Sequence, residues 1–295
     1  IREIEDLVRE HPTTDTLKVF NNGNILYGTE RKSGAELHEV FWTELPEALE
    51  RLPHLKTVEL EVRIDEFVGT EEIGNKQTPK GVLRDRFVQL DRALKKRGKT
   101  VRCILALEYV ESAILREQSK FPSTFASMGH AENNFIQAIC FMREHDIQWL
   151  GYAMFGGRLK KRSLTSHEAV SSAAHTALFA LQQGAREIII NTQYLDPINR
   201  EEEVRDGVKY YVPTEEDMRE MLRLIILGFD TVPKIDNVSP RVRLTTDKED
   251  IIKDTTGPDI APEFRCLVHG FNNASDQVAF FKQVFAPAAT GSDTH

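Results

Sequence analysis

Hydrophobic and polar residues alternate along the chain in two rhythms, one with the period of a strand and one with the period of a helix. Residues 56 to 64 place Val58, Leu60 and Val62 at every second position, which predicts a strand. Residues 81 to 96 then show apolar positions at helical spacing, and Gly98 follows as a left-handed helix cap. Strands are predicted at residues 17–20, 56–64, 101–107, 147–154 and 187–191, and helices before His11 and at residues 35–51, 81–96, 129–145, 166–183 and 214–227.

The predicted order is one helix followed by five strand–helix pairs, with about 40 residues per pair. Such alternation requires parallel strands with right-handed crossovers, in a doubly wound sheet or in a barrel. This repeat of strand–helix pairs ends near residue 230. We therefore divide the chain into an α/β domain at residues 1–230 and a C-terminal extension with a tail at residues 231–295. In either fold, ligands are expected at the loops that follow the strands.

Composition and charge limit the partners and the cellular compartment that are expected for this domain. The 295 residues carry a formal net charge of -8, which disfavours broad nucleic-acid affinity but leaves room for a local basic patch. No run of about 18 apolar residues is present, so no membrane span is predicted. Cys103, Cys140 and Cys266 lie far apart and form no CxxC motif, which favours a reducing, cytoplasmic compartment. The chain begins at Ile1 rather than at Met, and we expect a segment upstream of it.

Polar and small residues gather where each predicted strand ends. Amides, hydroxyls and carboxylates there can bind a ligand, and glycines let the backbone approach it closely. Turns favour the same residue types, so a single strand end is weak evidence, whereas five in register favour a site. The candidates are Asn21, Gly23, Asn24, Glu61, Arg63, Glu108, Ser112, Gly151, Met154, Gly156, Asn191 and Gln193, and no residue is assigned to a metal.

The strand at residues 56–64 carries Glu59, Glu61 and Arg63 on one face. Three ionisable groups on a central strand are costly unless they pair with other charges or line a polar cavity. The alternative is an edge strand whose polar face lies in water.

These segments, in this order, resemble the core of the radical S-adenosylmethionine (SAM) superfamily. The likeness is to its branch of elongator-type and archaeosine-synthase-like tRNA-modifying enzymes, and it covers roughly residues 1 to 230. It depends on Asn21-Asn22-Gly23-Asn24, Glu59-Leu60-Glu61-Val62-Arg63, Leu107-Glu108-Tyr109-Val110-Glu111-Ser112, Gly151-Tyr152-Ala153-Met154-Phe155-Gly156 and Ile190-Asn191-Thr192-Gln193. The resemblance implies a partial parallel (β/α) barrel of radical-SAM type.

The resemblance also implies a role for each strand end. Asn21, Gly23 and Asn24 would contact the methionine part of SAM, and Glu61 and Arg63 lie on the strand that follows. Glu108 and Ser112 would bind the ribose. Gly151, Met154 and Gly156 would lie beside the adenine, and Asn191 and Gln193 would face substrate or cofactor.

Radical-SAM chemistry requires a C-x₃-C-x₂-C loop whose thiolates hold a [4Fe–4S] cluster. This sequence has no such triplet. Three explanations stay open: the loop lies upstream, another chain supplies it, or the chemistry has been lost.

Three functions follow from these observations. The first is a radical-SAM-type enzyme that forms a 5′-deoxyadenosyl radical and, by resemblance, modifies RNA or a nucleobase, if the cluster loop lies upstream or in a partner. The second is a barrel without a cluster, acting as a binding or scaffold subunit. The third is an unrelated barrel enzyme, such as a metal-dependent lyase, that uses Glu59, Glu61 and Asp196.

A basic run follows the fourth predicted strand, at Arg158, Lys160, Lys161 and Arg162. On the ligand-binding edge it would suit RNA phosphates or a phosphorylated substrate. The alternative is a solvated surface loop.

Overall fold

The protein was analysed as a computed structural model. The structure describes residues 9, 15–19, 44–63, 82–111, 114, 128–157, 159, 161–191, 204–205, 208–209, 211–245, 251–252, 254–255 and 264–266.

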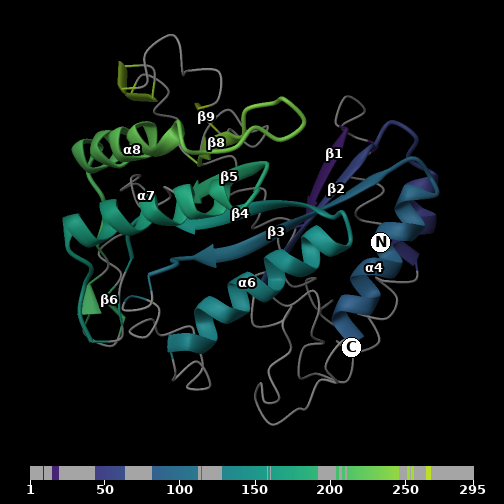
Figure 1. The fold of residues 1–295 in the computed structure, drawn as a ribbon, viewed down its shortest axis with the longest axis horizontal. Coiled ribbons are helices and arrows are strands. Elements are labelled where there is room, and N and C mark those ends of the chain that lie inside the picture. Colours follow the sequence, from purple (N-terminus) through teal and green to yellow (C-terminus); the bar gives the residue numbers. More distant parts are fainter. Residues whose placement is uncertain are drawn as a thin grey trace, which may run out of the picture.

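A single parallel sheet organises the described part of the chain (Figure 1). Its seven strands there are β1 Thr16–Val19, β2 Thr57–Arg63, β3 Thr100–Glu108, β4 Gln148–Met154, β5 Glu187–Asn191, β8 Arg241–Leu244 and β9 Phe264–Cys266. They lie in chain order, and every neighbouring pair is parallel. A sheet that grows in sequence order through helical crossovers is a partial (β/α) barrel, which confirms the predicted fold class.

Helices connect most of these strands, as the spacing predicts. Their bounds are α4 Val82–Lys95, α6 Met128–Glu144, α7 Ser166–Gln182 and α8 Glu215–Phe229, and residues 44–50 are also helical. Pro46 therefore lies within a helix. A short antiparallel hairpin, β6 Val204–Arg205 with β7 Val208–Lys209, precedes α8. No helix in the described ranges is both long and apolar enough to span a bilayer.

The sheet continues beyond residue 230, where the sequence rhythm ends. β8 pairs with β5, and β9 pairs with β8, both in parallel. These strands belong to the segment predicted to be an extension packed on the barrel. The structure places them in the sheet itself, because the β5–α8–β8 crossover repeats the geometry of the earlier units.

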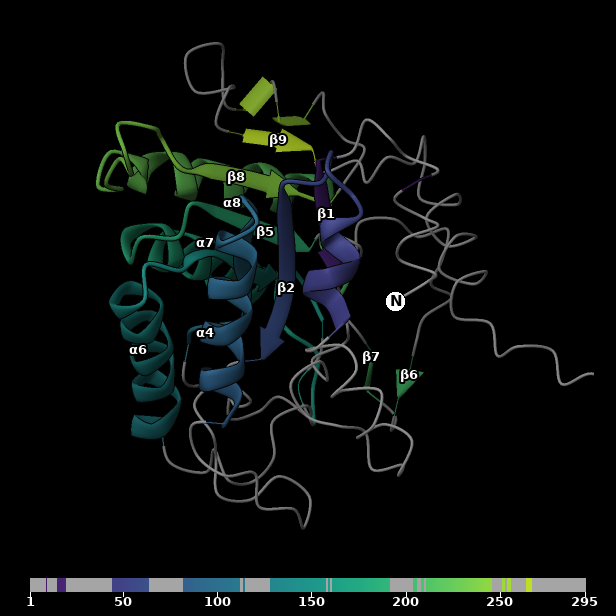
Figure 2. The same cartoon turned by 90° about the vertical axis from the view of Figure 1, so that its right-hand side faces the viewer.

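The helices α4, α6, α7 and α8 lie on one side of the sheet (Figure 2). Alternate strand residues, such as Cys103, Leu105 and Leu107 of β3, point to that side and join the main core. Phe87 and Leu94 of α4 belong to the same core and are fully buried. The helix-facing half of each strand therefore supplies the hydrophobic core.

The opposite face of the sheet carries buried charge. Glu59 of β2 is 2 % exposed, and its carboxylate contacts the Arg102 guanidinium of β3. Arg102 also donates to the Gln148 side chain of β4, at 3.1 Å. Two strands further on, Arg243 of β8 contacts Glu187 of β5 at 2.8 Å. β2 pairs on both sides, with β1 and β3, so the alternative of a wet edge strand is wrong and Glu59 is paired instead.

Candidate functional site at the carboxyl edge of the sheet

Parallel strands bring their carboxyl ends to one edge, where ligands of (β/α) barrels bind. Glu108 ends β3, Met154 ends β4, Asn191 ends β5, and Thr245 follows β8 directly. The register places Met154 opposite Asn191 and Glu108 opposite Ala153. Three of the predicted site residues therefore lie on neighbouring strand ends.

Glu108 has an unusual backbone conformation. Its φ is 53°, in the left-handed region, and the β3–β4 register shifts between Ala106 and Glu108. The other non-glycine residues with positive φ in the described ranges are Asp146, Asp236 and Asn237. Asp and Asn adopt this region readily in turns, whereas Glu does so at a cost. Local strain and a β-bulge at a strand end are typical of binding sites, since both redirect a side chain.

Asn191 connects three strand ends through its side-chain amide. Its Nδ2 donates to Met154 Sδ at 3.6 Å, and its Oδ1 accepts from Thr245 Oγ1 at 3.4 Å. Asn191 and Met154 are both buried, at 6 % and 8 % exposure. The amide therefore has a fixed orientation beneath the edge of the sheet. Thr245 is a member of this group that the sequence analysis missed, because no local pattern singles out one threonine after a short strand.

The segment that follows Glu108 is held against α7 and the end of β4. The Tyr109 hydroxyl donates to the backbone oxygen of Gly156. The Val110 N–H donates to Thr176 Oγ1 at 3.1 Å. Next to it, His175 Nδ1 of α7 lies 3.6 Å from Glu111 Oε1. The end of β3 is thus fixed by contacts on both sides.

Two of the predicted glycines are explained by packing. A Cβ on Gly151 would lie 2.5 Å from Ile188 Cδ1 and 2.9 Å from Ala180 Cβ, so this glycine lets α7 approach the sheet. Gly156 has φ 93°, and a Cβ there would lie 2.5 Å from the Pro213 ring. The space beside each glycine is therefore filled by the protein.

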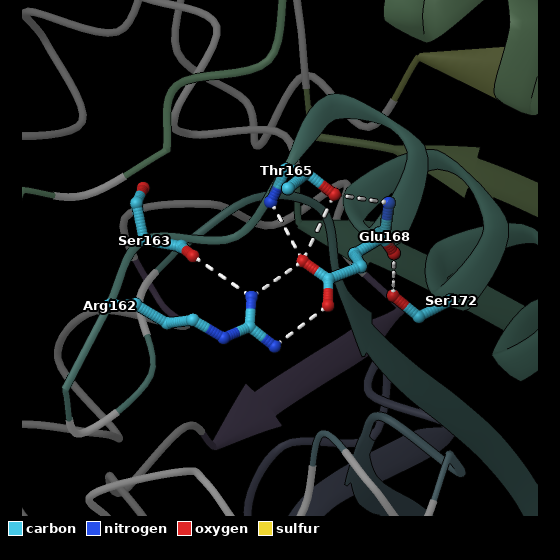
Figure 3. A network of polar contacts seen from close by, with 5 residues as sticks. All are labelled: Arg162, Ser163, Thr165, Glu168 and Ser172. Atoms are coloured by element: carbon cyan, nitrogen blue, oxygen red, sulfur yellow. Dashed lines mark hydrogen bonds and ion pairs between the residues drawn. The ribbon is translucent and has the colours of Figure 1, made fainter.

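The end of the basic run has a structural role (Figure 3). Arg162 Nη1 and Nη2 each contact a carboxylate oxygen of Glu168 at 2.8 Å. Glu168 also accepts from the Thr165 N–H, and the Thr165 side chain accepts from the Glu168 N–H, which forms a capping box at the start of α7. The hydrogen bonds from Arg162 lower the pKa of Glu168 to about 2. Arg162 is therefore paired with the glutamate that caps α7, whereas Lys161 is exposed.

The described residues do not fit an iron–sulfur cluster. Within the ranges that the structure describes, no group of three His, Cys, Asp or Glu side chains could hold a metal. Cys103 is fully buried in β3, where desolvation raises the pKa of its thiol well above the usual range, and Cys140 is exposed on α6. A cluster needs converging thiolates, so none can form from these two.

Several predicted site residues lie outside the ranges that the structure describes. Asn21, Gly23, Asn24, Ser112 and Gln193 fall outside the described residues, as do Asp196, Arg158 and Lys160. Glu61 and Arg63 lie in β2, but their side chains are not described. Their assignments stay predictions.

Comparison with known proteins gives no family for this chain. No protein-family model matches it, and no curated protein matches it in sequence. Among solved structures it is similar to a D-psicose 3-epimerase in the presence of D-fructose, with 11% identity, 76% of this chain and 68% of that chain covered, and a TM-score of 0.37. It is also similar to the HMG-CoA lyase of Brucella melitensis, with 9% identity, coverage of 83% and 74%, and a TM-score of 0.37.

A third similar structure is a GH5-4 endoglucanase from an uncultured bacterium, with 8% identity, 96% of both chains covered and a TM-score of 0.37. With TM-scores this low, these likenesses give no information on the reaction or ligand of this chain. Its function has to be inferred from its own residues.

Proposed function

We propose that this partial barrel is a radical-SAM-type domain that binds S-adenosylmethionine at the carboxyl edge of β3, β4 and β5. The observation that carries the proposal is the conformation of Glu108, which leaves β3 at a bulge with φ 53°. It lies in register with strand ends that carry Met154 and Asn191. These are the motifs on which the sequence resemblance depends.

The chemistry of these groups suits an adenosyl ligand. A carboxylate can accept two hydrogen bonds, which matches the two hydroxyls of a ribose, and Glu108 places a carboxyl group at the end of β3. The apolar Met154 side chain suits an adenine face. Asn191, oriented by Met154 and Thr245, contributes a polar boundary to the same region.

Radical formation lies beyond what the described residues can perform, since the thiolates for a cluster are missing from them. As an enzyme acting on RNA or a nucleotide, the barrel would therefore depend on a cluster loop from a segment upstream or from a partner chain. No reaction step is assigned to the described residues. Their role is to bind and orient the ligand.

A second candidate function is a binding or scaffold subunit without radical chemistry. The placement of the thiols favours it, because Cys103 is buried in the sheet and Cys140 lies on the outer surface of α6. Anaerobic reconstitution of the natural full-length protein with iron and sulfide separates the two candidates. An absorbance band at about 400 nm, typical of thiolate-bound clusters, supports the enzyme, and its absence leaves either the binding subunit or an enzyme whose cluster loop comes from a partner chain.

The metal-dependent lyase has less support. Glu59, one of its three proposed carboxylates, is buried and contacts Arg102. It is the third residue of β2, whereas the active sites of barrels lie at the carboxyl ends of strands.

Isothermal titration calorimetry with SAM tests the proposed ligand. We expect wild-type protein to bind SAM and Glu108→Gln to bind it at least ~10-fold more weakly, a loss of about 1.4 kcal/mol. The matched control is Glu144→Gln, the same change at an exposed residue of α6, which should bind like wild type. No heat with wild-type protein, or equal affinity in Glu108→Gln, refutes the proposal.

RNA is the proposed substrate class, and its binding can be measured separately. Fluorescence anisotropy with a labelled tRNA at several salt concentrations gives the number of phosphates contacted from the slope. A Lys161→Ala variant should reduce that slope, since Lys161 is exposed, whereas Arg162 is paired with Glu168. No binding at low salt contradicts an RNA substrate.

A further inference from the structure

The turn after β4 is held in place by a network of hydrogen bonds that extends to the first turns of α7 and α8. Gly156 and Gly157 form this turn, with φ of 93° and 125°. On one side the Tyr109 hydroxyl donates to the Gly156 oxygen. On the other side the Gly157 N–H donates to the Tyr211 oxygen at 2.9 Å, and the Tyr211 N–H donates to the Gly157 oxygen at 2.7 Å.

Tyr211 is anchored by its own side chain. Its hydroxyl donates to Asp217 Oδ2 at 2.7 Å. Burial raises the pKa of the Tyr211 phenol, and the neighbouring Asp217 raises it further, so the hydroxyl keeps its proton and acts as the donor. The backbone bridge to Gly157 is an isolated pair of hydrogen bonds outside the main sheet, and the Tyr211 hydroxyl anchors the residue on one side of it.

Asp217 connects this hydrogen-bond network to the starts of α7 and α8. Its Oδ2 accepts from the Thr214 N–H at 2.7 Å and from Thr214 Oγ1 at 2.8 Å, which closes the capping box of α8. Its Oδ1 accepts from Ser166 Oγ in the first turn of α7. Burial acts to raise the pKa of Asp217, but the hydrogen bonds from Ser166, Thr214 and Tyr211 outweigh it and lower the pKa. The carboxylate is thus charged and surrounded by donors.

We propose that Tyr211 and Asp217 are positioning residues for the ligand site: they hold the Gly156–Gly157 turn in the geometry that the ligand requires. The effect on the ligand rests on the proposed function, whereas the effect on the turn does not. Neither residue lies on a strand end, so both act through the backbone of the turn. Tyr109 holds the same turn from the β3 side, next to Glu108.

A helix cap alone would explain part of this network, but not the tyrosine. Thr214 and Asp217 satisfy each other without any help from Tyr211. Removing the Tyr211 hydroxyl leaves that capping box complete and removes only the side-chain hydrogen bond that anchors Tyr211 to Asp217, while the backbone hydrogen bonds to Gly157 can still form. Tyr211→Phe therefore separates positioning from helix stability.

Three measurements on Tyr211→Phe and wild-type protein test the inference. Hydrogen–deuterium exchange measures the protection of the Gly157 and Tyr211 N–H groups. Thermal unfolding measures overall stability, and calorimetry measures the affinity for SAM. The control is Thr231→Val at the far end of α8, which removes two side-chain hydrogen bonds of similar length, one donated to the Gly228 oxygen at 2.7 Å and one accepted from Gln182 Nε2 at 2.7 Å.

We expect faster exchange at the turn in Tyr211→Phe, by ~10-fold, with SAM binding weakened by a similar factor of about 10. Thr231→Val should leave both unchanged. Unchanged exchange at the turn in Tyr211→Phe overturns the inference, whatever the ligand does. Faster exchange with unchanged SAM affinity overturns the link to the ligand.

Asp217→Asn provides a second variant. With its amide oxygen at the position of Oδ2, the variant can still accept from Thr214 and Tyr211, but without a negative charge, and its NH₂ group opposes the Ser166 hydroxyl. The anchor of Tyr211 is therefore weakened, and the turn should exchange faster, by a smaller factor than in Tyr211→Phe. If Asp217→Asn does not fold, Tyr211→Phe decides the matter by itself. If wild-type protein binds no SAM, the proposed function is refuted. The exchange data still test whether Tyr211 and Asp217 hold the turn in place.

Discussion

Arg102 reaches across the β2–β3 pair to Glu59, with Nη1 3.3 Å from Oε1, on the face of the sheet turned away from the helices. The two side chains differ in their access to water, since Glu59 is 2 % exposed and Arg102 is 34 % exposed. Arg102 also donates to Gln148, so the guanidinium has a second acceptor on the next strand. Because of this difference in exposure, removing one partner should affect stability differently from removing the other.

Removing the arginine should cost more stability than removing the charge of the glutamate. Arg102→Met leaves a buried carboxylate without its guanidinium, and we expect a loss of about 3 kcal/mol in the free energy of unfolding. Glu59→Gln leaves a partly exposed arginine that still contacts Gln148, and we expect a loss of about 1 kcal/mol in the free energy of unfolding. Urea denaturation measures both. Replacing the two together, as Glu59→Leu with Arg102→Met, should recover most of the larger loss, and equal losses in the single variants contradict the assignment.

Gly151→Ala should destabilise the protein by crowding. The new methyl group would meet Ile188 Cδ1 at 2.5 Å and Ala180 Cβ at 2.9 Å, so α7 would have to move away from β4. We expect a loss of about 1–3 kcal/mol in urea denaturation. Gly98→Asn is the comparison, because Gly98 has φ 68° with nothing within 4 Å and Asn tolerates this conformation. Equal losses in the two variants would show that crowding does not decide the effect at Gly151.

The Glu168 carboxylate should make stability depend on pH in acid. Its pKa is about 2 in the folded protein against 4.5 for the ordinary group, so its contribution is complete above about pH 4.5 and is lost as the pH falls toward 2. The stability difference between wild type and Glu168→Gln should therefore shrink across this range. Thermal unfolding at a series of pH values measures it. Glu144→Gln serves as the control and should show no such trend, and a difference that grows as the pH falls would reverse the sign and refute the assignment.

The two described thiols should react at very different rates. Cys140 is exposed on α6, whereas Cys103 is buried in β3 with its thiol pKa raised by desolvation. A maleimide or disulfide reagent should label Cys140 in the folded protein and reach Cys103 only after unfolding. Peptide mapping by mass spectrometry distinguishes the sites. Labelling of Cys103 at the rate of Cys140 would show that β3 is not the buried central strand described above.

The strand and helix positions could be predicted from sequence because their signals are local. β2 and β5 were expected at residues 56–64 and 187–191 and span Thr57–Arg63 and Glu187–Asn191. The short strand β8 was not expected. Four residues with the pattern Arg-Val-Arg-Leu have no distinctive period, and their place is decided by pairing with β5.

The candidate site was predictable only in part. Strand order alone placed Glu108, Met154 and Asn191 at one edge, since parallel strands end together. Tyr211 and Asp217 were not predicted to belong to it. Asp217 was visible only as part of a helix start, and its contact with Tyr211 depends on how the segment before α8 folds back on Gly157.

The amino-acid sequence by itself determined the alternation of strands and helices, and with it the parallel sheet, because hydrophobic periodicity acts between residues a few positions apart. Tertiary structure alone decided that Glu59 pairs with Arg102, 43 residues away, and that Thr245 reaches Asn191, 54 residues away. Such pairs depend on the register and order of strands in the sheet. No local pattern encodes them, since each partner is set by the whole fold.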